Sequence, residues 1–166
     1  MHGVQGAVFQ LLNFSIVAGG LFLITGFLHH RIGSTDIIGL GGVAKSMSLL
    51  VAFFFFFGLA SMRVPGTNGF PAEFLLIVSA LSTHTGAGLA ALFTIVVGAG
   101  YFLGIYRQAF LGPVRHAVIS EAVGLRSREL ALVLVLAGLI LLLGLWPSSV
   151  LDITRVASEA WVGHLK

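Results

Sequence analysis

Two ionisable side chains, Arg63 and Glu73, lie inside an otherwise apolar stretch of the chain, Ser48–Ala80. Ionisable residues inside a membrane are costly and rare, and they usually mark the path of an ion or a proton. A carboxyl group in such a place can take up and release a proton. The sequence therefore favours Glu73 as a proton relay, with Arg63 as its candidate partner.

The segment between these two residues contains strong helix breakers. Proline lacks a backbone N–H and clashes with the preceding turn, and glycine and asparagine favour turns. Because lipid cannot hydrogen-bond the freed backbone groups, a broken helix must be buried in protein or line a water-filled cavity. We expect an interrupted helix with halves Ser48–Met62 and Pro71–Leu81. The residues assigned to the break are Pro65, Gly66, Asn68, Gly69 and Pro71.

The predicted start of the second half places Glu73 near a helix N-terminus. Pro71 suits the first helical position, which makes Glu73 the third residue. The partial positive charge of the helix end favours the ionised carboxylate, whereas burial favours the neutral acid. Opposing effects of this kind suit a group that exchanges protons. Arg63 is predicted at the C-terminal end of the first half, where a cation is favoured and can face Glu73 across the break.

A second interpretation is that Glu73 only caps a helix and that Arg63 is only its structural counter-ion. A neutral serine or asparagine would cap a helix at lower cost in lipid. The relay interpretation is therefore preferred over the cap, which stays open as an alternative.

The composition is that of an integral membrane protein. Of the 166 residues, 57% are hydrophobic and 9% are charged, and the mean hydropathy is +1.05. The chain has no cysteine, which excludes disulfides, thiolate metal sites and iron–sulfur clusters. Its six histidines do not form a metal-binding spacing, and no dinucleotide or phosphate-loop motif is present. We expect no metal site, no bound cofactor and no nucleic-acid binding.

Apolar segments of membrane-spanning length organise the chain into a single all-α transmembrane domain covering residues 1–166. A span needs about 20 apolar residues. We predict four spans, the second of which is the interrupted helix. Ile153, Val156, Ala160 and Trp161 recur at helical spacing in the tail, which predicts a short interfacial helix. The predicted spans cover about residues 4–28, 48–81, 87–110 and 130–146, and the tail covers residues 152–166.

The positive residues indicate how the spans are oriented. Six of the nine lysines and arginines fall in the two loops that follow the first and third predicted spans. The positive-inside rule places both loops in the cytoplasm and both termini outside. A hairpin of two crossings at the break would put these residues on opposite sides, so one interrupted crossing is favoured. The six residues are Arg31, Lys45, Arg107, Arg115, Arg126 and Arg128.

Short strings of residues recur in a familiar order over nearly the whole chain. They are Gly6–Gln10, His30–Asp36, Leu40–Lys45, Leu59–Ser61, Pro65–Phe74, Arg126–Leu130, Gly144–Pro147 and Val150–Asp152. Together they resemble the antiporter-like membrane subunits of respiratory complex I, the NADH:quinone oxidoreductase, and in particular the C-terminal part of the M type. A carboxylate rather than a lysine in the broken helix separates the M type from its L and N relatives.

The resemblance implies a function and partners. The chain would correspond to the last four of fourteen spans, and Glu73 to the family's glutamate in the proton exit half-channel. Such a subunit moves protons across the membrane, driven by quinone reduction elsewhere in the complex, and binds no redox cofactor itself. Its implied partners are the other membrane-arm subunits, including whatever supplies the missing spans, and its implied location is the bacterial inner membrane.

Three departures from the family keep alternatives open. The preceding spans are absent, Phe14 stands where the family usually has a histidine, and Arg63 stands where it usually has a small or apolar residue. Water or Asn13 would have to replace the missing histidine. The alternatives are a subunit of a multi-subunit cation/proton antiporter or hydrogenase membrane arm, and a structural membrane-arm piece without proton transfer.

Overall fold

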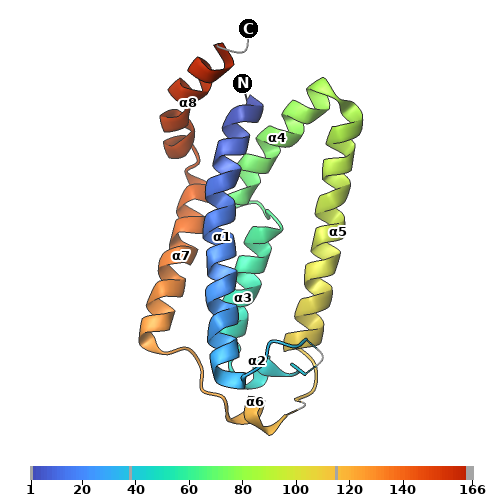
Figure 1. The fold of residues 1–166 in the computed structure, drawn as a ribbon, viewed down its shortest axis with the longest axis vertical. Coiled ribbons are helices and arrows are strands. Elements are labelled where there is room, and N and C mark those ends of the chain that lie inside the picture. Colours follow the sequence, from blue (N-terminus) through green and yellow to red (C-terminus); the bar gives the residue numbers. More distant parts are fainter. Residues whose placement is uncertain (1, 38, 115, 164–166) are drawn as a thin grey trace.

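The computed structural model describes residues 2–37, 39–114 and 116–163, and every regular element within these ranges is an α-helix (Figure 1). The predicted all-α class is therefore confirmed. The helices are α1 (His2–Ile32), α2 (Val43–Ser46), α3 (Ser48–Ser61), α4 (Gly69–Thr83), α5 (Thr85–Phe110), α6 (Ala117–Glu121), α7 (Ser127–Leu145) and α8 (Ser148–Gly163).

Three of these helices are long and apolar enough to cross a membrane. They comprise Val4–Ile32 of α1, Thr85–Phe110 and Ser127–Leu145, whereas α3 and α4 are apolar but shorter. The first helix continues beyond its predicted end at Leu28, because the polar residues His29, His30 and Arg31 add a solvated last turn. Basic side chains near a helix C-terminus interact favourably with its partial negative charge.

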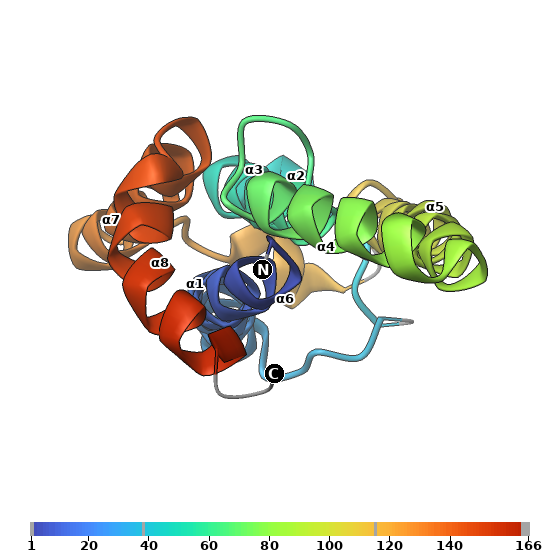
Figure 2. The same cartoon turned by 90° about the horizontal axis from the view of Figure 1, so that it is seen from above.

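Helix α1 is the centre of the bundle. It packs against α3, α4, α7 and α8, and in the view of Figure 2 it lies between α7 and the α3–α4 pair, with α5 at the outer edge. Figure 1 shows α3 and α4 following one another along the length of α1. The residues between them, 62–68, therefore lie beside the interior of α1 and not beyond its ends.

The two ends of the bundle differ in charge. The N-terminus, the turn between α4 and α5, and α8 lie at one end, and α2 and α6 lie at the other (Figure 1). The second end carries Arg31, Lys45 and Arg126, in agreement with the predicted placement of both basic loops on one side. Arg115 lies outside the described residues, as do the side chains of Val156, Ala160 and Trp161 on which the interfacial helix was predicted.

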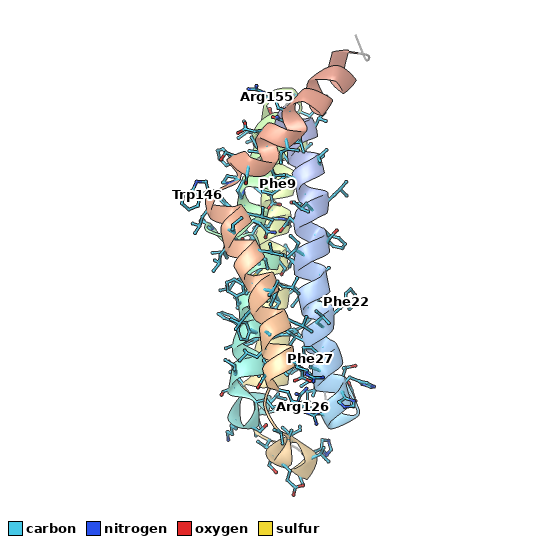
Figure 3. The ribbon with its side chains drawn as sticks, turned by 90° about the vertical axis from the view of Figure 1, so that its left-hand side faces the viewer. Phe9, Phe22, Phe27, Arg126, Trp146 and Arg155 are labelled. Carbon is cyan, nitrogen blue, oxygen red and sulfur yellow. The ribbon has the colours of Figure 1, made fainter. Side chains whose placement is uncertain are left out.

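An arginine fastens α1 to the start of α7 at the basic end. The Arg31 guanidinium is paired with the Glu129 carboxylate, and its Nε and Nη2 donate to the carbonyl oxygens of Val123 and Gly124 at 2.8 and 3.1 Å. Glu129 also accepts a hydrogen bond of 2.8 Å from the backbone N–H of Arg126, which supports the first turn of α7. This clamp fixes where α7 starts, next to Arg126, which Figure 3 labels near the start of that helix.

Helix α5 packs against α3 through aromatic rings. Phe54 of α3 lies 4.6 Å, between ring centroids, from Phe110, and Phe55 lies 4.8 Å from Tyr106. Helix α5 also contacts α4, which precedes it, and the short helix α2, and only 6% of the membrane-length window of α5 is buried in the chain. The remaining surface of α5 is apolar and uncovered.

Candidate functional site at the helix interruption

Helix α3 ends in a well-defined motif that places Arg63. The N–H groups of Arg63 and Val64 donate to the carbonyl oxygens of Ala60 and Leu59 at 3.1 and 3.2 Å, and Arg63 has a φ of 59°. This is a Schellman motif, whose left-handed position usually holds glycine. Holding a residue with a side chain there costs roughly 1–2 kcal/mol. Among the described residues, Arg63 is the one non-glycine residue with a positive φ. We therefore expect its side chain to make an interaction that offsets this cost.

That interaction is an ion pair with Glu73. The Arg63 Nη1 atom lies 2.9 Å from Glu73 Oε1, and the two side chains are 31% and 15% exposed. The pair therefore joins the end of α3 to the first part of α4 across the interruption.

The predicted position of Glu73 within its helix is wrong. Helix α4 begins at Gly69, so that Pro71 is its third residue and Glu73 its fifth, and no acidic residue lies in the first turn. The helix starts earlier than predicted because the first four N–H groups have no partner within a helix, and a proline at the third position removes none of its hydrogen bonds. The carboxylate is held by Arg63 and not by the helix N-terminus.

The loop between the helices turns at a glycine and is buried at its end, at Thr67 and Asn68. Gly66 has a φ of 96°, a conformation that side chains disfavour, and the Thr67 hydroxyl donates to the carbonyl of Val64 at 2.8 Å. Asn68 is fully buried and sits at the N-cap of α4, but its side chain does not cap the helix. Neither of its amide atoms has a hydrogen-bond partner within the described chain. Pro65 lies at the exposed rim of the same loop.

Helix α7 covers the interruption through a glycine. A Cβ atom at Gly144 would lie 2.5 Å from the carbonyl oxygen of Gly66 and 2.8 Å from the backbone nitrogen of Asn68. Backbone atoms of a buried loop cannot move aside as a flexible side chain can. The interruption is therefore enclosed by protein on the α7 side, as a broken helix in lipid requires.

We expect Gly144→Ala to destabilise the folded chain, because the added methyl group overlaps the backbone of the loop. Overpacking of this kind costs typically about 1–3 kcal/mol. The matched control is Gly138→Ala in the same helix, where nothing lies within 4 Å of the new Cβ and helix propensity improves. Thermal unfolding in detergent should show a lower Tm for the first variant and an equal or higher Tm for the second. Equal Tm values for the two variants would contradict the close contact.

On the α1 side, Asn13 is buried against the interruption, whereas Phe14 is largely exposed. Asn13 is 4% exposed, and its Nδ2 atom lies 3.1 Å from where a Cβ on Gly69 would be. Glycine at position 69 therefore permits this approach. Phe14 is 68% exposed, so most of its ring is not buried against the interruption, although it lines the hollows beside Arg63. The sequence places most weight on Phe14 and points to Asn13 only as a substitute for the missing histidine. The signal for Asn13 is an asparagine within a largely apolar helix.

Two hollows meet at Arg63. A pocket of about 190 Å³ lies between α1 and the end of α3, and a larger groove of about 590 Å³ runs between α1, α3 and α5. Ser61 and Arg63 line both hollows, together with Phe14. Within the part of the chain that the structure describes, no three histidine, aspartate or glutamate side chains are grouped to hold a metal ion.

Together these features define an α-helical integral membrane protein with an ion pair at an interruption between two helices. Residues 1–98 match the family described as NADH:quinone oxidoreductase/Mrp antiporter, TM. This match covers more than half of the 166 residues, and the chain belongs to that family.

Curated relatives agree with this assignment. The NADH-quinone oxidoreductase subunit M of Rickettsia felis is 36% identical over 158 residues, and that of Pseudomonas aeruginosa is 34% identical over 163 residues. These alignments cover 95% and 96% of this chain but 32% of each relative. The chain thus spans about a third of the length of these relatives. The predicted resemblance to M-type subunits is confirmed, and the bacterial relatives indicate the inner membrane.

Solved structures show the same fold. A chain of respiratory complex I from Thermus thermophilus with bound NADH matches 88% of this chain with a TM-score of 0.82 and 28% identity, over 30% of its own length. A chain of the Mrp complex from a Dietzia species matches 90% of this chain with a TM-score of 0.76, over 36% of its own length. Its identity of 24% makes the second likeness one of fold alone.

Proposed function

We propose that this chain is a membrane subunit, or part of one, of a proton-translocating NADH:quinone oxidoreductase, and that it contributes the proton exit half-channel with Glu73 as the relay. The Arg63–Glu73 ion pair at the interruption between α3 and α4 carries this proposal. Membership of the family and the subunit M relatives support it.

The interruption lies within the membrane, and Glu73 lies between it and the end of the bundle with the N-terminus, because the backbone of Ala72, next to Glu73, adjoins Gly6. Asn13, which adjoins the interruption, lies nine residues from Val4 and nineteen from Ile32, the ends of the first span. At about 1.5 Å per residue, these separations are roughly 14 and 28 Å. The hydrocarbon core is about 30 Å thick and the headgroup regions add several ångströms on each side, so the interruption falls within the hydrocarbon.

The same depth supports the assignment of Glu73 to a proton exit half-channel and not to a proton intake half-channel. The interruption is closer to the end of the bundle with the N-terminus and α8, which the positive-inside rule places outside. A proton released by Glu73 has the shorter distance to travel on that side. The topology we propose has four crossings, the second formed by α3 and α4 together, with α8 at the outer interface.

The pair also suggests how the relay operates. Ionised Glu73 is neutralised electrostatically by the Arg63 cation. When Glu73 accepts a proton, it becomes a neutral acid and its attraction to Arg63 weakens, which frees its O–H to turn outward. Loss of that proton restores the carboxylate and the pair. One proton enters and one leaves in each cycle, and no covalent step or cofactor is required from this chain.

The remaining components are expected to lie outside the given sequence. It spans about a third of its subunit M relatives, so the proton intake and the coupling to quinone reduction would lie in other parts of such a subunit or in partner chains of the membrane arm. The largely uncovered α5 offers an apolar surface for such partners.

A cation/proton antiporter subunit is the second candidate, because the family's description includes Mrp antiporters and an Mrp complex shares the fold. Proton translocation that depends on NADH and not on sodium supports the first candidate, and the reverse dependence supports the second. The direct test of either is Glu73→Gln in the assembled complex, where proton transfer should fall steeply. Unchanged proton transfer in this variant would favour the remaining interpretation, a structural part of a membrane arm without proton transfer.

A further inference from the structure

The smaller pocket beside Arg63 is lined by one face of α1. Its α1 residues recur at the spacing of a single helix face, and the other wall is the end of α3. Four of the lining side chains are polar, and four form an apolar wall. The polar residues are Gln10, Asn13, Ser61 and Arg63, and the apolar residues are Phe14, Val17, Ala18 and Leu21.

Two of these polar side chains present buried atoms that lack a protein partner. Asn13 donates from Nδ2 to Gln10 Oε1 at 3.4 Å, but its Oδ1 has no donor within the described residues. Arg63 uses Nη1 in the ion pair with Glu73, and its buried Nε has no acceptor there. Leaving such an atom unsatisfied costs roughly 1–3 kcal/mol, and more for a charged group.

The pocket has the size and the chemistry to satisfy these atoms with water. A volume of about 190 Å³ accommodates several water molecules, each of which needs 2–4 polar partners. The Asn13 oxygen accepts, the Arg63 Nε–H donates, and the Gln10 amide and the Ser61 hydroxyl add further partners. An apolar ligand would leave the Asn13 oxygen and the Arg63 Nε–H unpaired.

We propose that this pocket is an internal water site and that Asn13 is the residue that holds water in it. The site would place water against the Arg63 side of the ion pair, so it offers Glu73 a hydrated neighbour on the α1 face. This second step rests on the proposed function of Glu73, whereas the water site itself stands on the unpartnered atoms and the pocket. Asn13 is a positioning residue, because it acts on protons only through the water that it binds.

The absence of cysteine from the natural sequence permits a direct test. Gln10→Cys and Ser61→Cys each place a single thiol on the pocket, and Leu11→Cys places one at the same depth on an exposed face of α1, where Leu11 is 71% exposed. The full chain is probed in native membranes with a small hydrophilic thiol reagent, which reacts with the hydrated thiolate. We expect both pocket thiols to react at least about tenfold faster than the Leu11→Cys control.

A second substitution tests Asn13 itself. In the Gln10→Cys background, Asn13→Leu should reduce the labelling rate about tenfold, and Asn13→Ser should largely preserve it. Unreactive pocket thiols, or a Leu11→Cys control that reacts equally fast, would overturn the water site, and an unaffected rate with Asn13→Leu would overturn the role of Asn13. None of these outcomes depends on Glu73: labelling as expected together with full proton transfer in Glu73→Gln would reject the relay and retain the water site.

Discussion

Glu73→Gln is expected to reduce proton transfer through this subunit on the order of 10²-fold, the lower range for removal of a positioned acid–base group. Glutamine has nearly the same shape as glutamate but cannot release a proton. The measurement is NADH-driven acidification of inverted membrane vesicles that contain the assembled complex, normalised to the amount of complex and to NADH oxidation.

A matched substitution separates this effect from the loss of any acidic residue. Glu121 lies in α6 at the basic end of the bundle and is exposed, so Glu121→Gln should leave proton transfer unchanged. If Glu73→Gln complexes assemble normally and translocate protons at the full rate, the relay proposal fails. The ion pair would then be structural.

The second large effect is expected at Arg63. Arg63→Leu leaves the carboxylate of Glu73 without its counter-ion, and breaking a buried pair costs about 3–5 kcal/mol. Because the Arg63 side chain is 31% exposed in this chain, we expect a smaller loss of about 2–3 kcal/mol in the free energy of unfolding. A reduced yield of assembled subunit and a lower Tm in detergent report it.

Two further variants separate the ion pair from the backbone. Arg63→Gly also removes the pair but relieves the left-handed conformation, so it should be about 1 kcal/mol more stable than Arg63→Leu. In a Glu73→Gln background, Arg63→Leu should cost less than in the native chain, because no unpaired carboxylate remains. Equal costs in both backgrounds would show that the pair contributes nothing to stability.

Much of the fold could be predicted from the sequence because lipid imposes simple rules. Uninterrupted apolar runs of about 20 residues set the long helices, and the prolines and glycines after Met62 set the interruption. The boundaries were less predictable. A proline is tolerated anywhere in the first turn, so Pro71 marks the vicinity of a helix start and not its first residue.

Only the charged residues of the site could be predicted from the sequence. Arg63 and Glu73 are conspicuous because charge is rare in an apolar stretch, but contacts between distant segments leave no local pattern. The approach of Gly144 to the loop, and the clamp from Arg31 to the start of α7, depend on how helices far apart in the sequence pack. Which of Asn13 and Phe14 faces the break depends on the rotation of α1 about its axis, and a uniformly apolar helix gives little information on that rotation.

The loose attachment of α5 has a consequence for the life of the protein in the cell. Helix α5 is largely uncovered by the rest of the chain, and its ring contacts with α3 are tilted. Under the proposed function, partner chains of the membrane arm would cover this apolar helix. Proteases in cells remove chains that are not fully folded or assembled. The steady-state abundance of the protein should then rise and fall with the synthesis of those partner chains.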